Sequence, residues 1–306
     1  MPEWTPEIDV DADLARRLVG TQFPEVDTTS LEAFGEGWDN VLWLTGGGTL
    51  FRFPRREMAA PGVARELAVL PVLAGRLPLA VPAVERAGKP DEAAGYPWPF
   101  FGGPPIPGRE SGEAALTDDQ RAGIARPLGE FLHALHAPAT AEAVQAVYDL
   151  PVDPNRRADM GERIRRTRMA WGDLQRLGLW SPSGAIIDVI EGARMLRYPT
   201  TTAVVHGDLH FRHLLIEGGR LSGVIDWGDT CLACPAIDLP LYWSFFPPSA
   251  RAEFLQAYGP VSDQDLVRAR VLALWMNAVL ALYGHQTGKE AVVREAVGGL
   301  RRASVD

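Results

Sequence analysis

The stretch VVHGDLHFRHLLIEGGRLSGVIDWGD, residues 204–229, places three histidines and three aspartates among apolar runs that are typical of strands. Its second half predicts a β-hairpin, made of a strand at 214–217, a Gly218-Gly219 turn and a strand at 221–225. Two glycines suit such a tight turn because both central residues need positive φ. The hairpin should bring the loop at 206–213 close to Asp226.

Five side chains are therefore expected in one place: Asp208 and Asp226, with His206, His210 and His213 around them. Two uses fit this group. It can be a divalent metal site with a separate general base, or a metal-free structural network of hydrogen bonds. A carboxylate is unfavourable to bury without a partner, so a metal or a set of donors has to compensate. The spacing favours the metal.

Length and composition indicate an ordinary globular protein. The chain has 306 residues, 46% of them hydrophobic and 23% charged, which fits one large domain or two lobes. The net charge of −9 disfavours a nucleic-acid partner. The first twenty residues lack the basic start and apolar core of a signal peptide. The longest apolar tract, 271–283, is interrupted by Asn277 and is shorter than the roughly 20 residues of a membrane helix. We expect a buried core helix there, in a cytoplasmic protein without a membrane partner.

The two cysteines, Cys231 and Cys234, form a lone CxxC pair. A zinc site would need two further ligands at suitable spacing, and the sequence has no second cysteine pair. A redox pair would stand at a helix start, whereas Pro235 follows this one directly. We therefore expect two small buried thiols, with a zinc or redox role as the distant alternative.

Periodicity divides the chain into a strand-rich first part and a helical second part. The first hundred residues predict a short helix at 8–20, a hairpin around the TGGG turn between Val41 and Phe53, and a helix at 61–77 that Pro71 kinks or ends early. The segment GYPWPFFGGPPIPG at 95–108 holds so many glycines and prolines that we expect no regular element there. It is the best candidate for a domain boundary.

Two helices are expected after this boundary. The first begins with a capping box of Thr117 and Gln120, and His133 and His136 near its end are expected at the surface or beside the helix terminus. The second covers 155–177 and carries a run of six arginines between Arg156 and Arg168. Such a run is usually a solvated helix face, but it can also line a ligand cleft, and both interpretations stay open. Further helices are expected from about 263 to the end.

The site segment, read as VVHGDLHFRHLLI followed by GVIDWGDTCLACPAIDL, resembles the catalytic core of the aminoglycoside phosphotransferase family. In that family the pattern is H-G-D-x-x-x-x-N, then I-D, then D-P-x-x-D-L-A. The resemblance implies that Asp208 is the catalytic aspartate and that Asp226 holds the metal ion at the nucleotide phosphates. It implies structural roles for His206 and for Asp238, which would fix the catalytic loop. His210 receives no role.

The N-terminal half agrees with this resemblance, which spans roughly residues 30 to 245. FGEGWDNVLWL is similar to the nucleotide-covering hairpin of the family, with Gly35 and Gly37 near the phosphates, although Asn40 replaces the last glycine. TLFRFPRR matches the strand that carries the phosphate-binding cation, here Arg52. ARELAVL matches the helix whose glutamate pairs with that cation, here Glu66. Each residue alone could be an ordinary surface charge, but their order and spacing favour the nucleotide site.

Two residues depart from the family pattern. Arg52 stands where lysine is usual, and arginine keeps its charge and can bind phosphate as a fork. His213 stands where asparagine is expected. Mg²⁺ prefers oxygen ligands, whereas imidazole suits softer metals such as Mn²⁺. Either His213 ligates the metal through nitrogen, or one metal position is lost and filled by water. In a third interpretation His213 only packs or forms hydrogen bonds in the loop.

The resemblance implies an α+β, two-lobed, protein-kinase-like fold with a small β-rich N-terminal lobe and a larger, mainly helical C-terminal lobe. We place the nucleotide-binding lobe at 1–100, the catalytic and substrate-binding lobe at 101–306, and the hinge at about 95–105. The expected activity is transfer of the γ-phosphate of ATP or GTP, with Mg²⁺ or Mn²⁺, to a hydroxyl group of a small molecule such as an antibiotic. The alternative is a catalytically impaired, pseudokinase-like nucleotide-binding protein.

Overall fold

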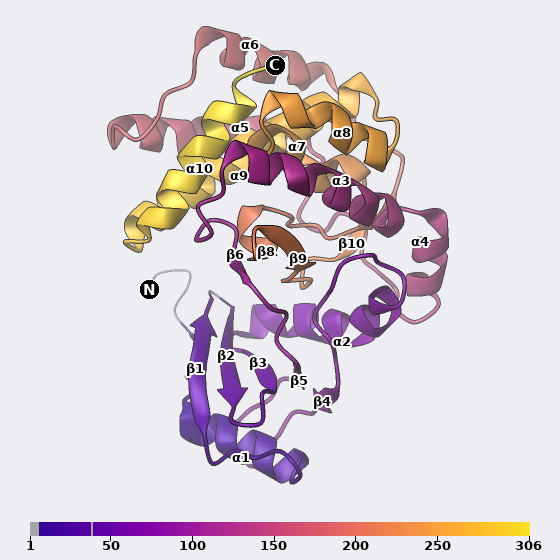
Figure 1. Cartoon of the computed structure of the whole chain (residues 1–306), viewed down its shortest axis with the longest axis vertical. Coiled ribbons are helices and arrows are strands. Elements are labelled where there is room, and N and C mark those ends of the chain that lie inside the picture. Colours follow the sequence, from indigo (N-terminus) through magenta and orange to yellow (C-terminus); the bar gives the residue numbers. More distant parts are fainter. Residues whose placement is uncertain (1–5, 38) are drawn as a thin grey trace.

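A computed structural model describes residues 6–37 and 39–306 (Figure 1). The chain forms a smaller sheet-containing part and a larger helical part, as expected. The smaller part is a five-stranded antiparallel sheet in the order β1-β2-β3-β5-β4. The strands are β1 (Leu31–Glu36), β2 (Asn40–Thr45), β3 (Leu50–Pro54), β4 (Arg86–Gly88) and β5 (Phe100–Gly103).

Two helices flank this sheet. Helix α1 (Ala12–Gln22) lies against one face, where Phe51 and Phe53 of β3 are fully buried. Because side chains alternate along a strand, Arg52 points to the opposite face, toward helix α2 (Ala60–Ala74). Helix α2 begins near Pro61 as expected, but it continues past Pro71 for three more residues.

The segment at 95–108 does contain a regular element, so the expectation of none was wrong. Strand β5 pairs with β3 and β4 inside the sheet. Its last two residues are glycines because neighbours leave no room for a side chain: a Cβ at Gly102 would lie 2.5 Å from the Phe51 ring, and one at Gly103 would lie 2.1 Å from the Ala83 carbonyl oxygen. Strand β6 (Arg109–Glu110) already pairs with β8. The chain therefore crosses between the two parts after Gly103.

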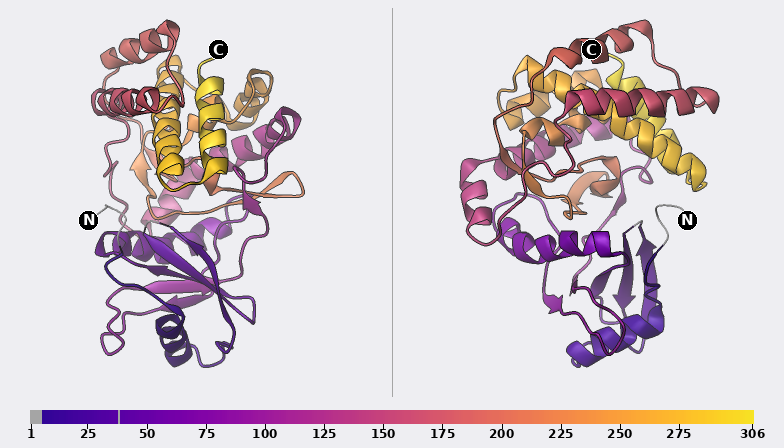
Figure 2. Two further views of the ribbon diagram at one scale, coloured as in Figure 1. Left: turned by 90° about the vertical axis from the view of Figure 1, so that its left-hand side faces the viewer. Right: turned by 180° about the vertical axis from the view of Figure 1, so that it is seen from behind.

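The larger part packs helices around two small sheets (Figure 2). The helices are α3 (Asp118–Leu135), α4 (Pro138–Gln145), α5 (Met160–Arg176), α6 (Gly184–Gly192), α7 (Pro240–Ser244), α8 (Pro248–Tyr258), α9 (Asp263–Gln286) and α10 (Glu290–Ala303). The strands are β7 (Ala203–Val205), β8 (Leu214–Glu217), β9 (Arg220–Val224) and β10 (Cys231–Ala233), with the pairs β7-β10 and β6-β8-β9. Helix α9 is the one helix of the described chain that is both long enough and apolar enough to cross a membrane. However, 72% of its most apolar 18-residue stretch is buried inside the protein. It is a core helix, as expected.

Local sequence signals set several of these boundaries. Thr117 and Gln120 form the expected capping box of α3. The Gly218-Gly219 turn has φ of +56° and +77°, as the hairpin required. The helix expected at 155–177 begins only at Met160, because Asp159 caps its N-terminus and Arg156 before it has a φ of +48°. The start of α1 is likewise later than expected, with Asp11 as the cap.

Candidate active site

Asp238 holds the loop that follows β7 through hydrogen bonds to its backbone. This fully buried carboxylate accepts hydrogen bonds from the backbone N–H groups of His206 (2.6 Å) and Gly207 (3.0 Å). Gly207 has a φ of +87°, and a Cβ there would lie 2.3 Å from the carbonyl oxygen of Asp229. A glycine is therefore required before Asp208. The sequence placed Asp238 correctly beside this loop.

A histidine of helix α3 completes the support. His136 Nε2 lies 3.2 Å from Asp238 Oδ2, and its Nδ1 lies 2.8 Å from the hydroxyl oxygen of Tyr258. His136 stands at the C-terminus of α3, which was one of the two expected positions, but it is not at the surface, because its side chain is only 5% exposed. His133, three residues earlier, is exposed as expected. The contact of His136 depends on the docking of α3 against the 235–238 turn, which local sequence does not reveal.

His206 is a neutral ring with both nitrogens satisfied. Its Nε2 donates to the carbonyl oxygen of Ile225 (3.0 Å), and its Nδ1 accepts from the N–H of Asp208 (3.3 Å). Burial lowers the pKa of His206 below its usual value. Since both nitrogens of this buried, uncharged ring are hydrogen-bonded to main-chain groups, His206 holds the backbone at Asp208 and Ile225 in position. This geometry agrees with the structural role expected for it.

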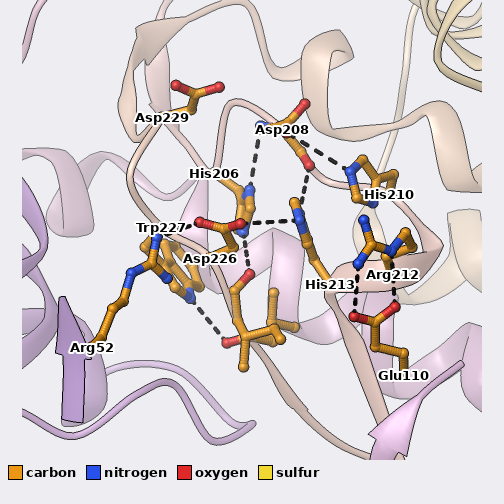
Figure 3. Close-up of polar contacts among 12 residues, drawn as sticks. Arg52, Glu110, His206, Asp208, His210, Arg212, His213, Asp226, Trp227 and Asp229 are labelled. Atoms are coloured by element: carbon orange, nitrogen blue, oxygen red, sulfur yellow. Dashed lines mark hydrogen bonds and ion pairs between the residues drawn. The ribbon is translucent and has the colours of Figure 1, made fainter. Parts of the chain in front are cut away.

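Arg52 joins the two parts of the protein at the site (Figure 3). Its Nη2 lies 2.7 Å from Asp226 Oδ1, and its Nη1 lies 3.4 Å from Glu66 Oε1. Burial would raise the pKa of Asp226, but Arg52 and His213 together hold it well below the usual range. Burial raises the pKa of Glu66 to about 7, although Arg52 opposes that rise. The structure therefore brings together the three residues that the sequence predicted from strand, helix and loop.

Helix α2 is fastened to the turn that follows Asp226. Glu66, which is 0% exposed, also accepts a hydrogen bond from the N–H of Trp227 (2.9 Å). Arg65 donates to the carbonyl oxygen of Gly228. A Cβ added at Gly62 would approach that same oxygen to 3.2 Å, so the helix lies directly against the turn. Asp226 itself has a φ of +68°, an uncommon backbone conformation that these contacts hold in place.

His213 bridges the two aspartates (Figure 3). Its Nδ1 donates to the backbone carbonyl oxygen of Asp208 (2.9 Å), so Nδ1 carries a proton, and its Nε2 lies 3.3 Å from Asp226 Oδ2. In a neutral ring the Nε2 lone pair would face the carboxylate, which is repulsive unless a proton or a metal ion lies between them. Burial alone would lower the pKa of His213, but the hydrogen bond to Asp226 and the negative charges of Asp226 and Asp208 together raise it.

These donors fit a divalent cation. Ligand atoms of Asp208, His210 and His213 lie within 4.8 Å of one another, and Asp226 Oδ2 lies 3.3 Å from His213 Nε2. The ring centroids of His210 and His213 lie 3.8 Å apart, and among the described residues no group forms a hydrogen bond with the buried Nδ1 of His210. Mixed carboxylate and imidazole donors suit Mn²⁺ better than Mg²⁺. The sequence left His210 without a role, and the structure places it in this group.

Arg157 is the contact that the sequence did not predict. Its Nη1 lies 2.6 Å from Asp208 Oδ1, and its Nη2 lies 2.5 Å from Asp229 Oδ2. Desolvation raises the pKa of Asp208, and the guanidinium limits that rise. Arg157 belongs to the arginine run that could be either a solvated face or part of a cleft. The run divides: Arg157 and Arg163 are buried, whereas Arg165 and Arg166 are exposed and pair with Glu162.

The glycines expected over the nucleotide are not required by the fold. Gly35 lies in β1, and a Cβ there would meet the Leu42 side chain at an ordinary 3.6 Å. A Cβ at Gly37 would lie 3.7 Å from the carbonyl oxygen of Asn40. Neither residue needs positive φ, so a ligand that approaches the backbone closely would explain both glycines.

Both cysteines are buried and unbridged, as expected. Burial raises the pKa of Cys231 and Cys234 to about 12. Redox exchange and metal binding both use the thiolate, so the environment of these thiols disfavours either chemistry.

The Phosphotransferase enzyme family model matches residues 30–272, most of the chain. The chain belongs to this family. Among curated proteins, the uncharacterized protein YcbJ of Bacillus subtilis (strain 168) is 39% identical over 62 residues, which cover 20% of either chain. Because that match spans only a fifth of YcbJ, it adds nothing about activity.

Solved structures of phosphotransferases share the fold. An aminoglycoside 2'-phosphotransferase-IIIa in complex with GDP is 23% identical, covers 96% of this chain and 98% of its own, and has a TM-score of 0.68. A macrolide 2'-phosphotransferase of Brachybacterium faecium is 22% identical, with 95% and 98% coverage and a TM-score of 0.62. The expected α+β, two-lobed, protein-kinase-like fold is therefore confirmed, and the family is one of small-molecule phosphotransferases.

Proposed function

We propose that this protein transfers the γ-phosphate of ATP or GTP to a hydroxyl group of a small molecule. The observation that carries the proposal is the position of Arg52, which contacts Glu66 and Asp226 at once. A buried cation held between a helix carboxylate and a loop carboxylate, beside a second aspartate, is the arrangement that phosphoryl transfer uses.

In this proposal each side chain has one task. Asp208 accepts the proton of the acceptor hydroxyl and orients its oxygen for in-line attack on the γ-phosphate. Arg52 binds phosphate oxygens as a fork, and Glu66 orients Arg52. Asp226 and His213 hold the divalent ion, which supplies charge neutralisation at the phosphates when it is bound.

We place the nucleotide between the 34–53 hairpin, with Gly35 and Gly37, and the hinge at about 95–105. The nucleotide-binding lobe would then be residues 1–100 and the catalytic lobe residues 101–306. Similar solved structures support a nucleotide donor, since they include complexes with GDP and with ATP. A macrolide 2'-phosphotransferase and a gentamicin complex among them support a hydroxylated acceptor, including an antibiotic.

The test is Asp208→Asn, which keeps the size of the side chain and removes the proton acceptor. Loss of a general base lowers turnover by about 10²–10⁴-fold. We would measure transfer of labelled γ-phosphate from ATP and from GTP to hydroxylated compounds, and hydrolysis without acceptor, with Mg²⁺ or Mn²⁺. Asp188→Asn on exposed helix α6 is the matched control. Full turnover by Asp208→Asn would disprove the assignment.

One observation favours a second function, a nucleotide-binding protein without turnover. Both aspartates are engaged by arginines in this structure: Arg157 holds Asp208, and Arg52 holds Asp226. If these ion pairs persist with ligand bound, Arg157 weakens Asp208 as a base and Arg52 competes with a metal ion for Asp226. Nucleotide binding by calorimetry, with no phosphate release in either metal and no transfer to any acceptor tested, would support this alternative over the enzyme.

A further inference from the structure

Two buried arginines and a tryptophan lie next to Asp208. The guanidinium carbons of Arg157 and Arg163 lie 5.8 Å and 4.4 Å from the ring centroid of Trp275. The Trp275 ring, on helix α9, is partly exposed. Arg157 reaches Asp208 directly, so the three side chains form one cationic cluster that touches Asp208. We call them the Arg157–Trp275–Arg163 cluster.

Arg163 is a buried cation without a carboxylate partner. It is 2% exposed, and within the described chain none of its nitrogens lies at ion-pairing distance from an acid. One nitrogen of Arg163 reaches the carbonyl oxygen of Asn155 at 3.4 Å, and its Nε has no hydrogen-bond partner within residues 6–37 and 39–306. Burial, together with Arg166 and Arg157, lowers the pKa of Arg163 to about 10.

The rest of the same helix shows that this arrangement is not a general feature of its arginines. Arg165 and Arg166 both pair with Glu162, and Arg168 pairs with Glu191. A buried charge without a partner is unfavourable, and replacing it by an apolar side chain of similar size often leaves stability unchanged or increases it. Stability therefore does not explain Arg163, but a negatively charged ligand would.

The loop that carries Arg157 is built rigidly around one carboxylate. Asp153 accepts hydrogen bonds from the N–H groups of Arg157 (2.7 Å) and Ala158 (3.0 Å) and from the Tyr198 hydroxyl (2.5 Å). Asp153 and Arg156 have φ of +34° and +48°, although neither is glycine. Strained backbone that surrounding contacts hold in place is frequent at ligand sites.

We propose that the Arg157–Trp275–Arg163 cluster is an anion subsite for the acceptor, and that the acceptor carries a carboxylate or another oxyanion group. This inference rests on the proposed phosphotransferase function. Arg157 already neutralises Asp208 and Asp229, so an ammonium group arriving there would meet a guanidinium instead of a free carboxylate. A polycationic acceptor is disfavoured for the same reason, whereas an anion would give Arg163 its missing partner and could lie against the Trp275 ring.

The experiment measures binding of labelled sulfate by equilibrium dialysis, at constant ionic strength and with excess ADP. Arg163→Met should weaken sulfate binding about tenfold or more. Arg166→Met, an equal change of charge three residues away on the exposed face, should bind sulfate like the wild-type protein. Arg163→Met should melt at the same temperature as the wild type or higher. Arg163→Lys, which keeps the charge, should retain part of the binding if Arg163→Met fails to fold.

Competition separates the two sources of an anion. Displacement of sulfate by D-glycerate, a small hydroxy acid, supports an acceptor carboxylate. Displacement by inorganic phosphate without displacement by D-glycerate means a site for free anions and overturns the acceptor assignment. Equal sulfate binding by the wild type and Arg163→Met, or no saturable binding, overturns the subsite itself. Turnover of Asp208→Asn tests the proposed function separately, because sulfate binding does not depend on it.

Discussion

Arg52 and Arg157 bind different carboxylates of the same site, and each arginine holds two of them. Arg52 contacts Glu66 and Asp226, and Arg157 contacts Asp208 and Asp229. The carboxylates differ in exposure. The Glu66 side chain is 0% exposed, whereas those of Asp226, Asp208 and Asp229 are 44%, 30% and 39% exposed. Arg52 therefore binds one carboxylate in the interior of the protein, whereas both carboxylates bound by Arg157 are open to solvent.

Because of this difference, we expect the contacts of Arg52 to govern stability and those of Arg157 to govern which acceptor binds. On the Arg52 side, loss of the Glu66 carboxylate leaves a buried charge and a buried N–H without partners, so the stability of the fold should decrease. On the Arg157 side, solvent can replace a lost partner, so the fold should tolerate changes that alter which acceptor binds. Substitutions on the two sides can test this division.

The largest effect on stability should come from Glu66→Ala. It leaves Arg52 without its helix partner and the Trp227 N–H without an acceptor. Breaking a buried pair in this way lowers the free energy of unfolding by about 3–5 kcal/mol. Urea denaturation of the purified protein measures it. Glu130→Ala, at an exposed glutamate of α3, is the control and should change stability by less than about 0.5 kcal/mol. Equal effects from the two variants would contradict the division.

His213→Asn should have an intermediate effect, on metal preference. His213 touches both sides, through the Asp208 carbonyl and the Asp226 carboxylate. Asparagine offers oxygen in place of nitrogen, so the ratio of Mg²⁺ to Mn²⁺ activation should rise about tenfold. Activation constants for nucleotide hydrolysis measure this ratio. His133→Asn, at the exposed histidine of α3, should leave it unchanged, and an unchanged ratio in His213→Asn would mean that the ring only packs.

The smallest effect should come from Asp229→Asn. The variant keeps the shape of the side chain and removes the negative charge of Asp229. Arg157 thereby loses one of its two carboxylate partners and keeps the other, Asp208. Because the Asp229 side chain is 39% exposed, the loss of stability should be below about 1 kcal/mol. Thermal denaturation at low and at 0.5 M salt measures it. A loss as large as that of Glu66→Ala would show that Arg157 is structural too.

The Arg52 side could be predicted from the sequence, and the Arg157 side could not. Arg52 and Glu66 lie in a strand and a helix whose patterns are regular, and Asp226 follows a hairpin that its Gly-Gly turn defines. Arg157 lies in an irregular loop before α5 and meets acids 51 and 72 residues further along the chain. Only tertiary packing sets that contact. The available signal that the helix begins later than 155 was Asp159, an N-cap residue with Glu162 three positions further on.

Strand β5 shows the same limit in the fold. Its Gly-rich sequence predicts no regular element, and the strand forms because β3 and β4 offer backbone partners on both edges. The glycines that argued against a strand are the residues that allow Phe51 and Ala83 to pack closely on it. Local propensity gave the wrong answer here because the tertiary neighbours decide.

The attachment of helix α2 has a consequence for regulation. In protein kinases, activity is switched by moving the helix that carries the glutamate. Here Glu66, Arg65 and Gly62 all bind or touch the turn that follows Asp226, so this helix cannot swing out without breaking a buried ion pair and two backbone contacts. In the proposed phosphotransferase, the site would therefore be assembled before any ligand arrives, and control would have to act on something other than the position of this helix.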